Sequence, residues 1–221
     1  MTAAGDHGER RAAGLSAQSV AALERCIASG GVAVFPADTV YGLACDPESP
    51  AAVDRLYGLK GRAPDRPAAV MCFSLADALA AVPELGPRTT GALERLMPGP
   101  VTAILPNPGR RFPLACGPVP ERLGLRVPGL DPPLAPLAAL RRPILQSSAN
   151  RSGGPDAGHL EDVDPSIRHG ADLALDAGKL PGTPSTVVDL SRYEDDGSHS
   201  IIREGALPAD AVEAALGGWA R

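Results

Sequence analysis

Short apolar runs divide this chain, and each stops within a few residues at a glycine, a proline or a polar turn. Runs of this length are typical of buried strands and are too short for helices. The 25 glycines and 24 prolines are spread along the 221 residues, which predicts many sharp turns rather than disorder. We expect strands at Val32–Phe35, Ala68–Phe73, Val101–Leu105, Leu123–Val127, Pro143–Gln146, Leu173–Leu175, Thr186–Leu190 and Ser200–Arg203.

Helical signals lie between these runs. Ser16 can cap a helix that Gly30-Gly31 ends, and Ser49-Pro50 opens a second helix with Lys60 at or just past its end. Further helices are expected from Ser74, over Thr89–Leu96 and Leu134–Leu140, and from Pro208. Strands and helices alternate irregularly, which predicts an α/β (α+β) domain with a mixed sheet and helices on its faces. We expect a disordered tail at 1–14, one domain at 15–216 and a C-terminal tail at 217–221.

Charge and motif content exclude several classes of function. The net charge is −5, which disfavours wholesale coating of nucleic acid. The chain has no Walker phosphate loop, no Rossmann glycine motif and no zinc-protease motif. The four cysteines and four histidines lack metal-ligand spacing, so no metal site is expected. No apolar run is long enough to cross a membrane and no signal-peptide core is present, so we expect a cytoplasmic protein without membrane contact.

Three cations lie close together where the second helix ends. Lys60, Arg62 and Arg66 belong to the segment Lys60–Pro67, which also contains a glycine and two prolines. A lysine at a helix C-terminus has a structural explanation, because it complements the helix dipole. The two arginines lie beyond the helix, and a loop with three cations in an acidic protein favours phosphate binding.

Two further segments place polar groups at or within strands. Thr39 and Tyr41 offer hydroxyls directly after the first strand, although an Asx-type turn made by Asp38 explains this segment equally well. Arg126 lies within an otherwise apolar strand. A buried, unpaired arginine is very costly, so Arg126 must reach a carboxylate, a ligand, or solvent from an edge strand.

A Ser-Ala-Asn turn follows the strand that ends near Gln146. Ser148 and Asn150 carry both donors and acceptors, which suits the orientation of a polar ligand and also suits an ordinary turn. Ser185 and Arg203 repeat the pattern of a polar group at a strand end. Each signal is weak alone, and the prediction of a site depends on their coincidence.

Taken together, these segments resemble the YrdC-like family of threonylcarbamoyl-AMP synthases, in its single-domain form. They run in family order and cover residues 15–216. The resemblance implies a twisted, open sheet with a concave, positively charged face. The matching segments are Pro36–Leu43, Lys60–Pro67, Pro98–Leu105, Leu125–Pro128, Ser148–Gly153, Ser185–Leu190 and Ile202–Gly205.

The resemblance also implies an activity, that of a nucleotidyltransferase which condenses L-threonine, bicarbonate and ATP into L-threonylcarbamoyladenylate and pyrophosphate. The tRNA threonylcarbamoyl transferase machinery would use this product to modify adenosine 37 of tRNA. Lys60 and Arg62 would be catalytic, by neutralising charge on the α-phosphate and on the departing pyrophosphate. Mg²⁺ would be carried in with ATP. The resemblance assigns Lys60, Arg62, Arg66, Asn150 and Arg203 to ATP or adenylate binding, and Thr39, Arg126, Ser148 and Ser185 to threonine binding.

The chain departs from the family pattern at a few positions. Ala37 stands where threonine is usual, and Met71 where some members offer a polar contact to the amino acid. Ala44, Arg66 and Glu204 replace a usual glycine, lysine and proline. Two alternatives stay open beside the synthase: a module of the same fold that binds RNA, if only weakly, and a paralogue that makes a different carbamoyl adenylate.

Overall fold

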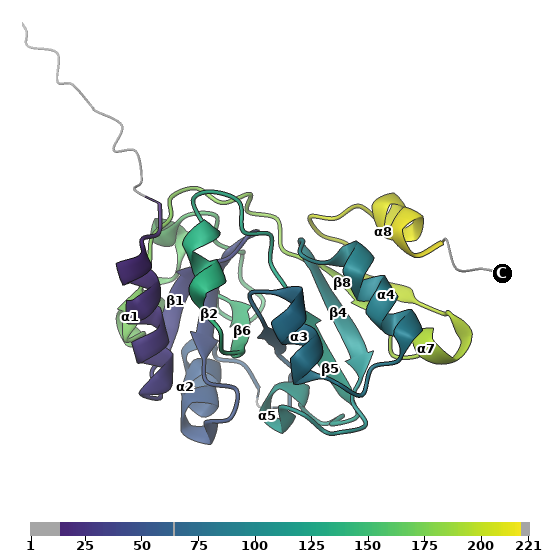
Figure 1. The fold of residues 1–221 in the computed structure, drawn as a ribbon. Helices are drawn as coiled ribbons and strands as arrows, with labels where there is room; N and C mark the ends of the chain where they lie inside the picture. Colours follow the sequence, from purple (N-terminus) through teal and green to yellow (C-terminus); the bar gives the residue numbers. More distant parts are fainter. Residues whose placement is uncertain (1–13, 64, 218–221) are drawn as a thin grey trace, which may run out of the picture.

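One mixed sheet runs through the molecule. The computed structural model describes residues 14–63 and 65–217, in which nine strands follow the order β7-β1-β2-β6-β3-β5-β4-β8-β9 (Figure 1). Apart from Gly14 and Gly217, the expected tails at 1–14 and 217–221 lie outside the described residues. The strands are β1 (Ala33–Pro36), β2 (Tyr41–Cys45), β3 (Ala69–Met71), β4 (Val101–Pro106), β5 (Arg122–Arg126), β6 (Ile144–Ser148), β7 (Leu173–Ala174), β8 (Thr186–Asp189) and β9 (Ser200–Arg203).

The sheet is open and twisted, as expected, because β7 and β9 lie at its two ends and do not pair with each other. β1 pairs with β7, β3 with β5, and β4 with β8 in parallel, whereas the other neighbours are antiparallel. The strands rotate visibly from one end of the sheet to the other in Figure 1. This pairing confirms the mixed α/β class that the irregular order of elements predicts.

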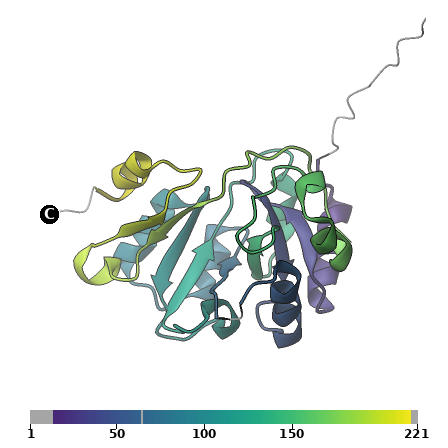
Figure 2. The ribbon, with the colours of Figure 1, turned by 180° about the vertical axis from the view of Figure 1, so that it is seen from behind.

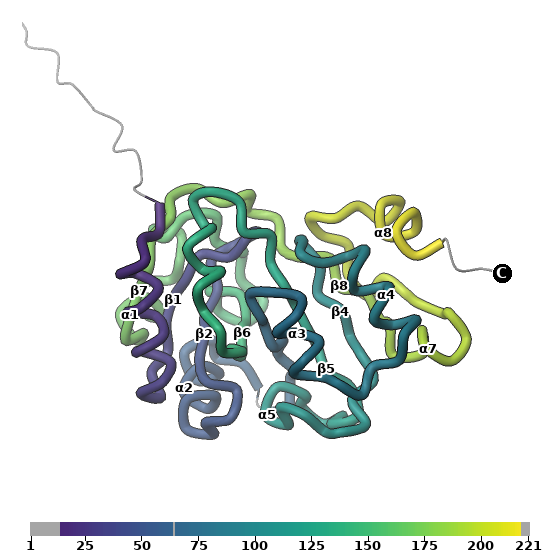
Figure 3. The backbone as a smooth tube through the Cα atoms, viewed as in Figure 1, coloured from purple at the N-terminus to yellow at the C-terminus, as the bar shows by residue number. Residues whose placement is uncertain are grey.

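Helices lie on both sides of the sheet, as the opposite views in Figures 1 and 2 show. In the tube drawing of Figure 3, α1 lies beside β1 at one end of the sheet, and α4, α7 and α8 lie together at the other end. None of the described helices is long and apolar enough to cross a membrane. The helices are α1 (Ala17–Ala28), α2 (Pro50–Lys60), α3 (Leu75–Ala81), α4 (Pro87–Leu96), α5 (Pro113–Cys116), α6 (Pro165–Gly170), α7 (Tyr193–Asp196) and α8 (Ala209–Leu216), with 3-10 turns η1 (Ala135–Ala139) and η2 (Leu160–Asp162).

The local structure differs from the sequence expectations in two places. The polar segment after the first strand is a turn followed by strand β2, which is fully buried between β1 and β6. Its sequence, Tyr-Gly-Leu-Ala-Cys, has little intrinsic strand preference, so pairing on both sides decides its conformation. The helix expected at Leu134–Leu140 is the 3-10 turn η1, in which Pro136 occupies the first turn. The short helices α5 and α7 were not expected.

Two groups of buried side chains hold the layers together. The larger contains Leu56 of α2, Leu93 of α4 and the inward residues of the central strands, such as Leu125. The smaller joins α1 and η1 to β1, with Leu23 and Phe35 fully buried in it. Both are built mainly from aliphatic side chains, with a few aromatic ones, so burial of apolar surface is the main stabilising term.

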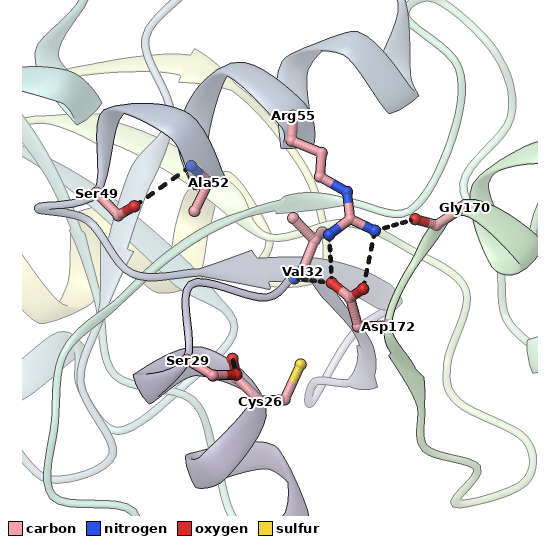
Figure 4. Close-up of polar contacts among 8 residues, drawn as sticks. All are labelled: Cys26, Ser29, Val32, Ser49, Ala52, Arg55, Gly170 and Asp172. Atoms are coloured by element: carbon pink, nitrogen blue, oxygen red, sulfur yellow. Dashed lines mark hydrogen bonds and ion pairs between the residues drawn. The ribbon is translucent and has the colours of Figure 1, made fainter.

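Helix α2 carries the cationic segment at its C-terminus. Contacts at both of its ends and in its middle fix its position. Ser49 caps its first turn, and Gly61 ends it in the left-handed conformation at φ 58°, with the Arg62 N–H donating to the Tyr57 carbonyl at 2.9 Å. In its middle, Arg55 grips Asp172 through two hydrogen bonds of 2.5 and 3.0 Å and donates to the Gly170 carbonyl (Figure 4).

The carboxylate of Asp172 also accepts from the backbone N–H of Val32 at 2.8 Å, which ties α2 to the start of β1. The hydrogen bonds from Arg55 are the main reason why the pKa of Asp172 is lowered. The side chains of Arg55 and Asp172 are 42% and 43% exposed, so their ion pair contributes little to the free energy of unfolding. The pair matters because it fixes the position of α2.

The two glycines near the end of α2 predict opposite responses to alanine. Gly61→Ala should destabilise the fold by about 1 kcal/mol, because a left-handed residue strains any side chain even where space is open. Gly58→Ala should stabilise it by about 0.5 to 1 kcal/mol, because Gly58 is exposed inside the helix and a Cβ there meets nothing within 4 Å. Urea unfolding of both variants measures the difference, and equal midpoints would contradict this account of the helix end.

Candidate functional site

A cavity of about 510 Å³ opens over the strands at the centre of the sheet and reaches the β8–β9 hairpin. Three polar segments far apart in the sequence meet in its wall: the loop after α2, the end of β6, and the β8–β9 region. Its lining residues include Arg62, Pro67, Ala69, Thr102, Ile104, Cys116, Val119, Arg122, Gly124, Arg126, Gln146, Ser147, Ser148, Ser185, Val187, Ile202 and Arg203.

Strand alternation explains which side chains line the cavity. On β4, Thr102 and Ile104 line it, and the intervening Ala103 belongs to the larger core group. On β5, Arg126 lines it whereas Leu125 is buried in the core. Because successive side chains on a strand point to opposite faces, these strands pack one face into the larger core group and line the cavity with the other.

The cavity wall is rich in arginine. Four of its described lining residues are arginines, and none is aspartate or glutamate. Arg126 is buried and Arg62 is partly buried, and burial is the main cause that lowers the pKa of each guanidinium. The Nε atoms of both have no hydrogen-bond partner among the described residues. Such a wall suits a ligand with several negative charges.

Arg126 is buried in the cavity wall with a carboxylate beside it. Its side chain is 4% exposed, and its Nη2 donates to Asp38 Oδ1 and to Thr39 Oγ1, the latter at 2.6 Å. Asp38 uses its other oxygen to accept from the Gly129 N–H at 2.9 Å. Asp38 therefore makes a long-range pair rather than the local Asx-type turn that was the alternative explanation of this segment. β5 lies between β3 and β4, so the edge-strand explanation for Arg126 was wrong.

Lys60 lies under the end of β6. It is 2% exposed and is not among the lining residues of the cavity. Its Nζ donates to the carbonyls of Ser148 and Asn150, the latter at 2.9 Å, and to Asn150 Oδ1 at 3.0 Å. Burial, with a smaller effect of Arg62, lowers the pKa of Lys60 to about 8, and the charge of Asp156 opposes that shift. The simple dipole-cap explanation for Lys60 is therefore insufficient.

Arg62 reaches the cavity from the loop beyond Gly61. Its guanidinium lies 5.8 Å from the centre of the Tyr57 ring and donates to Ser147 Oγ at 3.3 Å and to the Pro67 carbonyl. These contacts direct the planar group toward the end of β6, where Ser147 and Ser148 line the same wall.

The β8–β9 side of the cavity is also held by polar contacts. Ser185 Oγ and Thr102 Oγ1 lie 2.9 Å apart, and Arg203 donates to the Ser185 carbonyl at 2.7 Å. Arg203 is exposed, and its neighbour Ile202 is 59% exposed at the rim. Arg122 approaches from β5 and pairs with Asp189.

The structure brings most of the predicted residues together, with different exposures. Five line the cavity: Arg62, Arg126, Ser148, Ser185 and Arg203. Thr39, Lys60 and Asn150 lie behind the wall, each bonded to a lining residue or its backbone. Arg66 is exposed on the loop and is not a lining residue.

Tyr41 does not offer its hydroxyl to a ligand, because its side chain is buried and the hydroxyl lies 2.8 Å from both Asp176 Oδ1 and the Gly178 carbonyl, which share its single proton. Sequence reasoning missed Thr102, Arg122 and Gln146 as lining residues. Their alternation with apolar neighbours was the available signal.

Two departures from the family pattern lie outside the cavity wall. Ala37 and Met71 are both buried in the smaller core group with α1 and η1, at 2% and 0% exposure. Neither lines the cavity. Their identities therefore bear on packing behind the site rather than on direct contact with a ligand.

The family model and the relatives that this chain resembles point to the same family of proteins. The Sua5/YciO/YrdC family model, described as "Telomere recombination", matches residues 25–205. A threonylcarbamoyl-AMP synthase of Chromohalobacter salexigens is 35% identical over 182 residues, covering 80% of this chain and 94% of the relative. One from Pyrococcus abyssi is 28% identical, and the chain spans only 55% of its length.

Solved structures agree with the fold. The Sua5 protein of P. abyssi in complex with L-threonine superposes with a TM-score of 0.80 at 27% identity, over 92% of this chain and 58% of that one. YciO of E. coli gives a TM-score of 0.77 at 24% identity, over 89% of this chain and 94% of that one, and this likeness concerns the fold alone.

The Asp38–Arg126 pair predicts a large cost when its carboxylate is removed. Asp38→Ala should destabilise the fold by about 3 to 5 kcal/mol, because it leaves a charged guanidinium buried without its partner. Glu121→Ala is the matched control, since its pair with Arg110 is exposed and should contribute less than about 1 kcal/mol. Denaturant unfolding measures both, and similar midpoints would show that Arg126 does not depend on Asp38.

Proposed function

The chain belongs to the Sua5/YciO/YrdC family, and on that premise we propose that it is a threonylcarbamoyl-AMP synthase, an enzyme that forms an adenylate from L-threonine, bicarbonate and ATP. The observation that carries the proposal is the cavity with four arginines and no carboxylate among its described lining residues. ATP and the carboxylate of threonine are both anionic, so one such cavity suits both substrates.

The proposed reaction has two steps. The amine of threonine first takes up bicarbonate with loss of water, which makes a carbamate. A carbamate oxygen then attacks the α-phosphorus of ATP, so that a new P–O bond forms while the bond to the β-phosphate breaks and pyrophosphate leaves. No covalent enzyme intermediate is required, and the contribution of the protein is to orient the reactants and stabilise charge.

Arg126 is proposed to bind the carboxylate of threonine. Its fork geometry suits two carboxylate oxygens, and its pairing with Asp38 and Thr39 holds it in the cavity wall. Thr39 would then act through Arg126, because Thr39 is fully buried. Ser148 and Ser185 line the same wall and supply hydroxyls for the amino acid.

The nucleotide is proposed to lie against Arg62 and Arg203. Both are cavity cations from loop or edge positions, and Arg62 would stabilise charge on the α-phosphate and the leaving pyrophosphate. Asn150 supports the adjacent wall, and exposed Arg66 adds positive charge at the entrance. Arg122, on the same face of β5 as Arg126, is a further cation for this ligand.

Mg²⁺ is proposed to enter as part of the ATP substrate. No group of three or more His, Cys, Asp or Glu side chains among the described residues could hold a metal ion. The donors of the cavity are cationic or neutral, which suits phosphate oxygens rather than a bare cation. Oxygens of the triphosphate and water are ligands that Mg²⁺ prefers.

The adenylate product is proposed to pass to the tRNA threonylcarbamoyl transferase machinery, which would modify adenosine 37 of tRNA. Direct RNA binding is the less favoured function. No Phe, Tyr or Trp is found among the described lining residues, and single-stranded RNA generally stacks on aromatic rings. A paralogue with another amino-acid substrate is also less favoured, because Ala37 and Met71 lie behind the wall.

A direct assay tests the proposed function. The protein is incubated with ATP, threonine, bicarbonate and Mg²⁺, and pyrophosphate and the adenylate are measured, the latter by mass. We expect release that depends on both threonine and bicarbonate. Pyrophosphate release that is no greater with threonine than without it would contradict the proposal, and release supported better by serine would favour the paralogue.

Arg62→Ala should lower kcat/KM by about 10² to 10³, because it removes a donor that stabilises developing charge. Arg192→Ala is the control, since Arg192 pairs with Asp196 on α7 and does not line the cavity. Activity of Arg62→Ala equal to that of the control would remove Arg62 from the mechanism.

A further inference from the structure

Lys60 uses all of its hydrogen-bonding capacity inside the protein. An ammonium group has three N–H donors, and Lys60 Nζ has three acceptors: the carbonyls of Ser148 and Asn150 and the side-chain oxygen of Asn150. Its side chain is buried and lies outside the cavity wall. A phosphate group could bind this ammonium only after one of these contacts broke.

The acceptors belong to one short segment, and that segment is linked within itself. Asn150 Oδ1 accepts from Lys60 and also from Ser148 Oγ at 2.7 Å. Asn150 Nδ2 donates to the Gly154 carbonyl at 2.6 Å. The backbone N–H of Ser152 donates to the carbonyl of Lys60 itself at 2.8 Å. Lys60, at the end of α2, therefore contacts residues 148–154 through both its ammonium group and its backbone carbonyl.

The hydrogen bonds of Lys60 offset part of the cost of burying its charge. Burial and the nearby charge of Arg62 lower the pKa of Lys60, whereas its acceptors are carbonyl oxygens with partial negative charge and the carboxylate of Asp156 opposes the shift. A buried ammonium with satisfied donors is tolerated, whereas the removal of its charge leaves the carbonyls of Ser148 and Asn150 without this donor. The Lys60 charge thus has a structural partner before any ligand arrives.

We propose that Lys60 is a positioning residue, which holds Ser148 and the segment 148–154 in the cavity wall before ligand binds, rather than a group that contacts phosphate. The proposal revises the catalytic role expected for Lys60 and, in its kinetic consequence, rests on the proposed function. Because Ser148 is on the threonine side, loss of Lys60 should affect threonine as well as ATP.

Hydrogen exchange in the ligand-free protein tests the proposal without any assay of activity. Lys60→Met keeps an unbranched side chain that is only one atom shorter, and removes the ammonium group with its charge. We expect amides in peptides covering 148–154 to exchange at least about tenfold faster than in the wild type, since hydrogen bonds from a charged group are lost. Arg62→Met, the matched control from the same motif, should leave exchange there within about twofold. Wild-type exchange in Lys60→Met would overturn the proposal.

Steady-state kinetics provide a readout that separates positioning from phosphate binding. In Lys60→Met we expect KM to rise for threonine by a factor similar to that for ATP, whereas Arg62→Met should raise mainly the KM for ATP. A Lys60→Met enzyme with a changed KM for ATP and an unchanged KM for threonine would overturn the proposal. If neither variant nor the wild type makes adenylate, the proposed function fails while the exchange experiment still tests Lys60.

A second variant covers the case in which Lys60→Met does not fold, as judged by circular dichroism. Asn150→Ala removes one acceptor of Lys60 together with the acceptor of Ser148 Oγ, and leaves both backbone carbonyls in place. We expect faster exchange over the same peptides, by a smaller factor. Exchange equal to the wild type in Asn150→Ala would likewise overturn the proposal.

Discussion

The contact of the Lys60 ammonium with the carbonyls of Ser148 and Asn150 joins the two parts of the site. A buried cation needs a partner for each donor, so this contact fixes the end of α2 against the end of β6. Everything that orients α2 therefore orients the cavity wall. The Arg55–Asp172 clamp and the left-handed Gly61 set the position and the end of that helix.

Arg126, a second buried cation, is stabilised by a different kind of partner. Arg126 has a carboxylate partner, Asp38, whereas Lys60 has neutral carbonyls and a more remote carboxylate. The pairing compensates most of the charge of Arg126 within the wall. Arg62, in contrast, is bonded to Ser147 and Pro67, which are neutral acceptors. Arg203 likewise donates to a neutral acceptor, the Ser185 carbonyl. The charges of Arg62 and Arg203 are therefore not offset by a carboxylate in this way, which agrees with their proposed place beside the nucleotide.

The local elements with strong signals were predictable. Local sequence determines the helix caps at Ser16 and Ser49. It also determines strands β1 and β4, because each is a short apolar run. β2 could not be predicted, because its Gly-Leu-Ala core has no strong preference and becomes a strand only between β1 and β6.

By itself, the sequence determined the mixed α/β class, most of the elements, the family and the identity of the polar residues that gather around the cavity. Only the tertiary structure decided which of these residues face a ligand. Lys60 and Arg62 are two positions apart, yet the turn at Gly61 leaves one tied beneath β6 and directs the other into the cavity. Burial and hydrogen-bond partners come from segments about ninety residues away, so no local pattern could distinguish a lysine that holds the wall from an arginine that lines it.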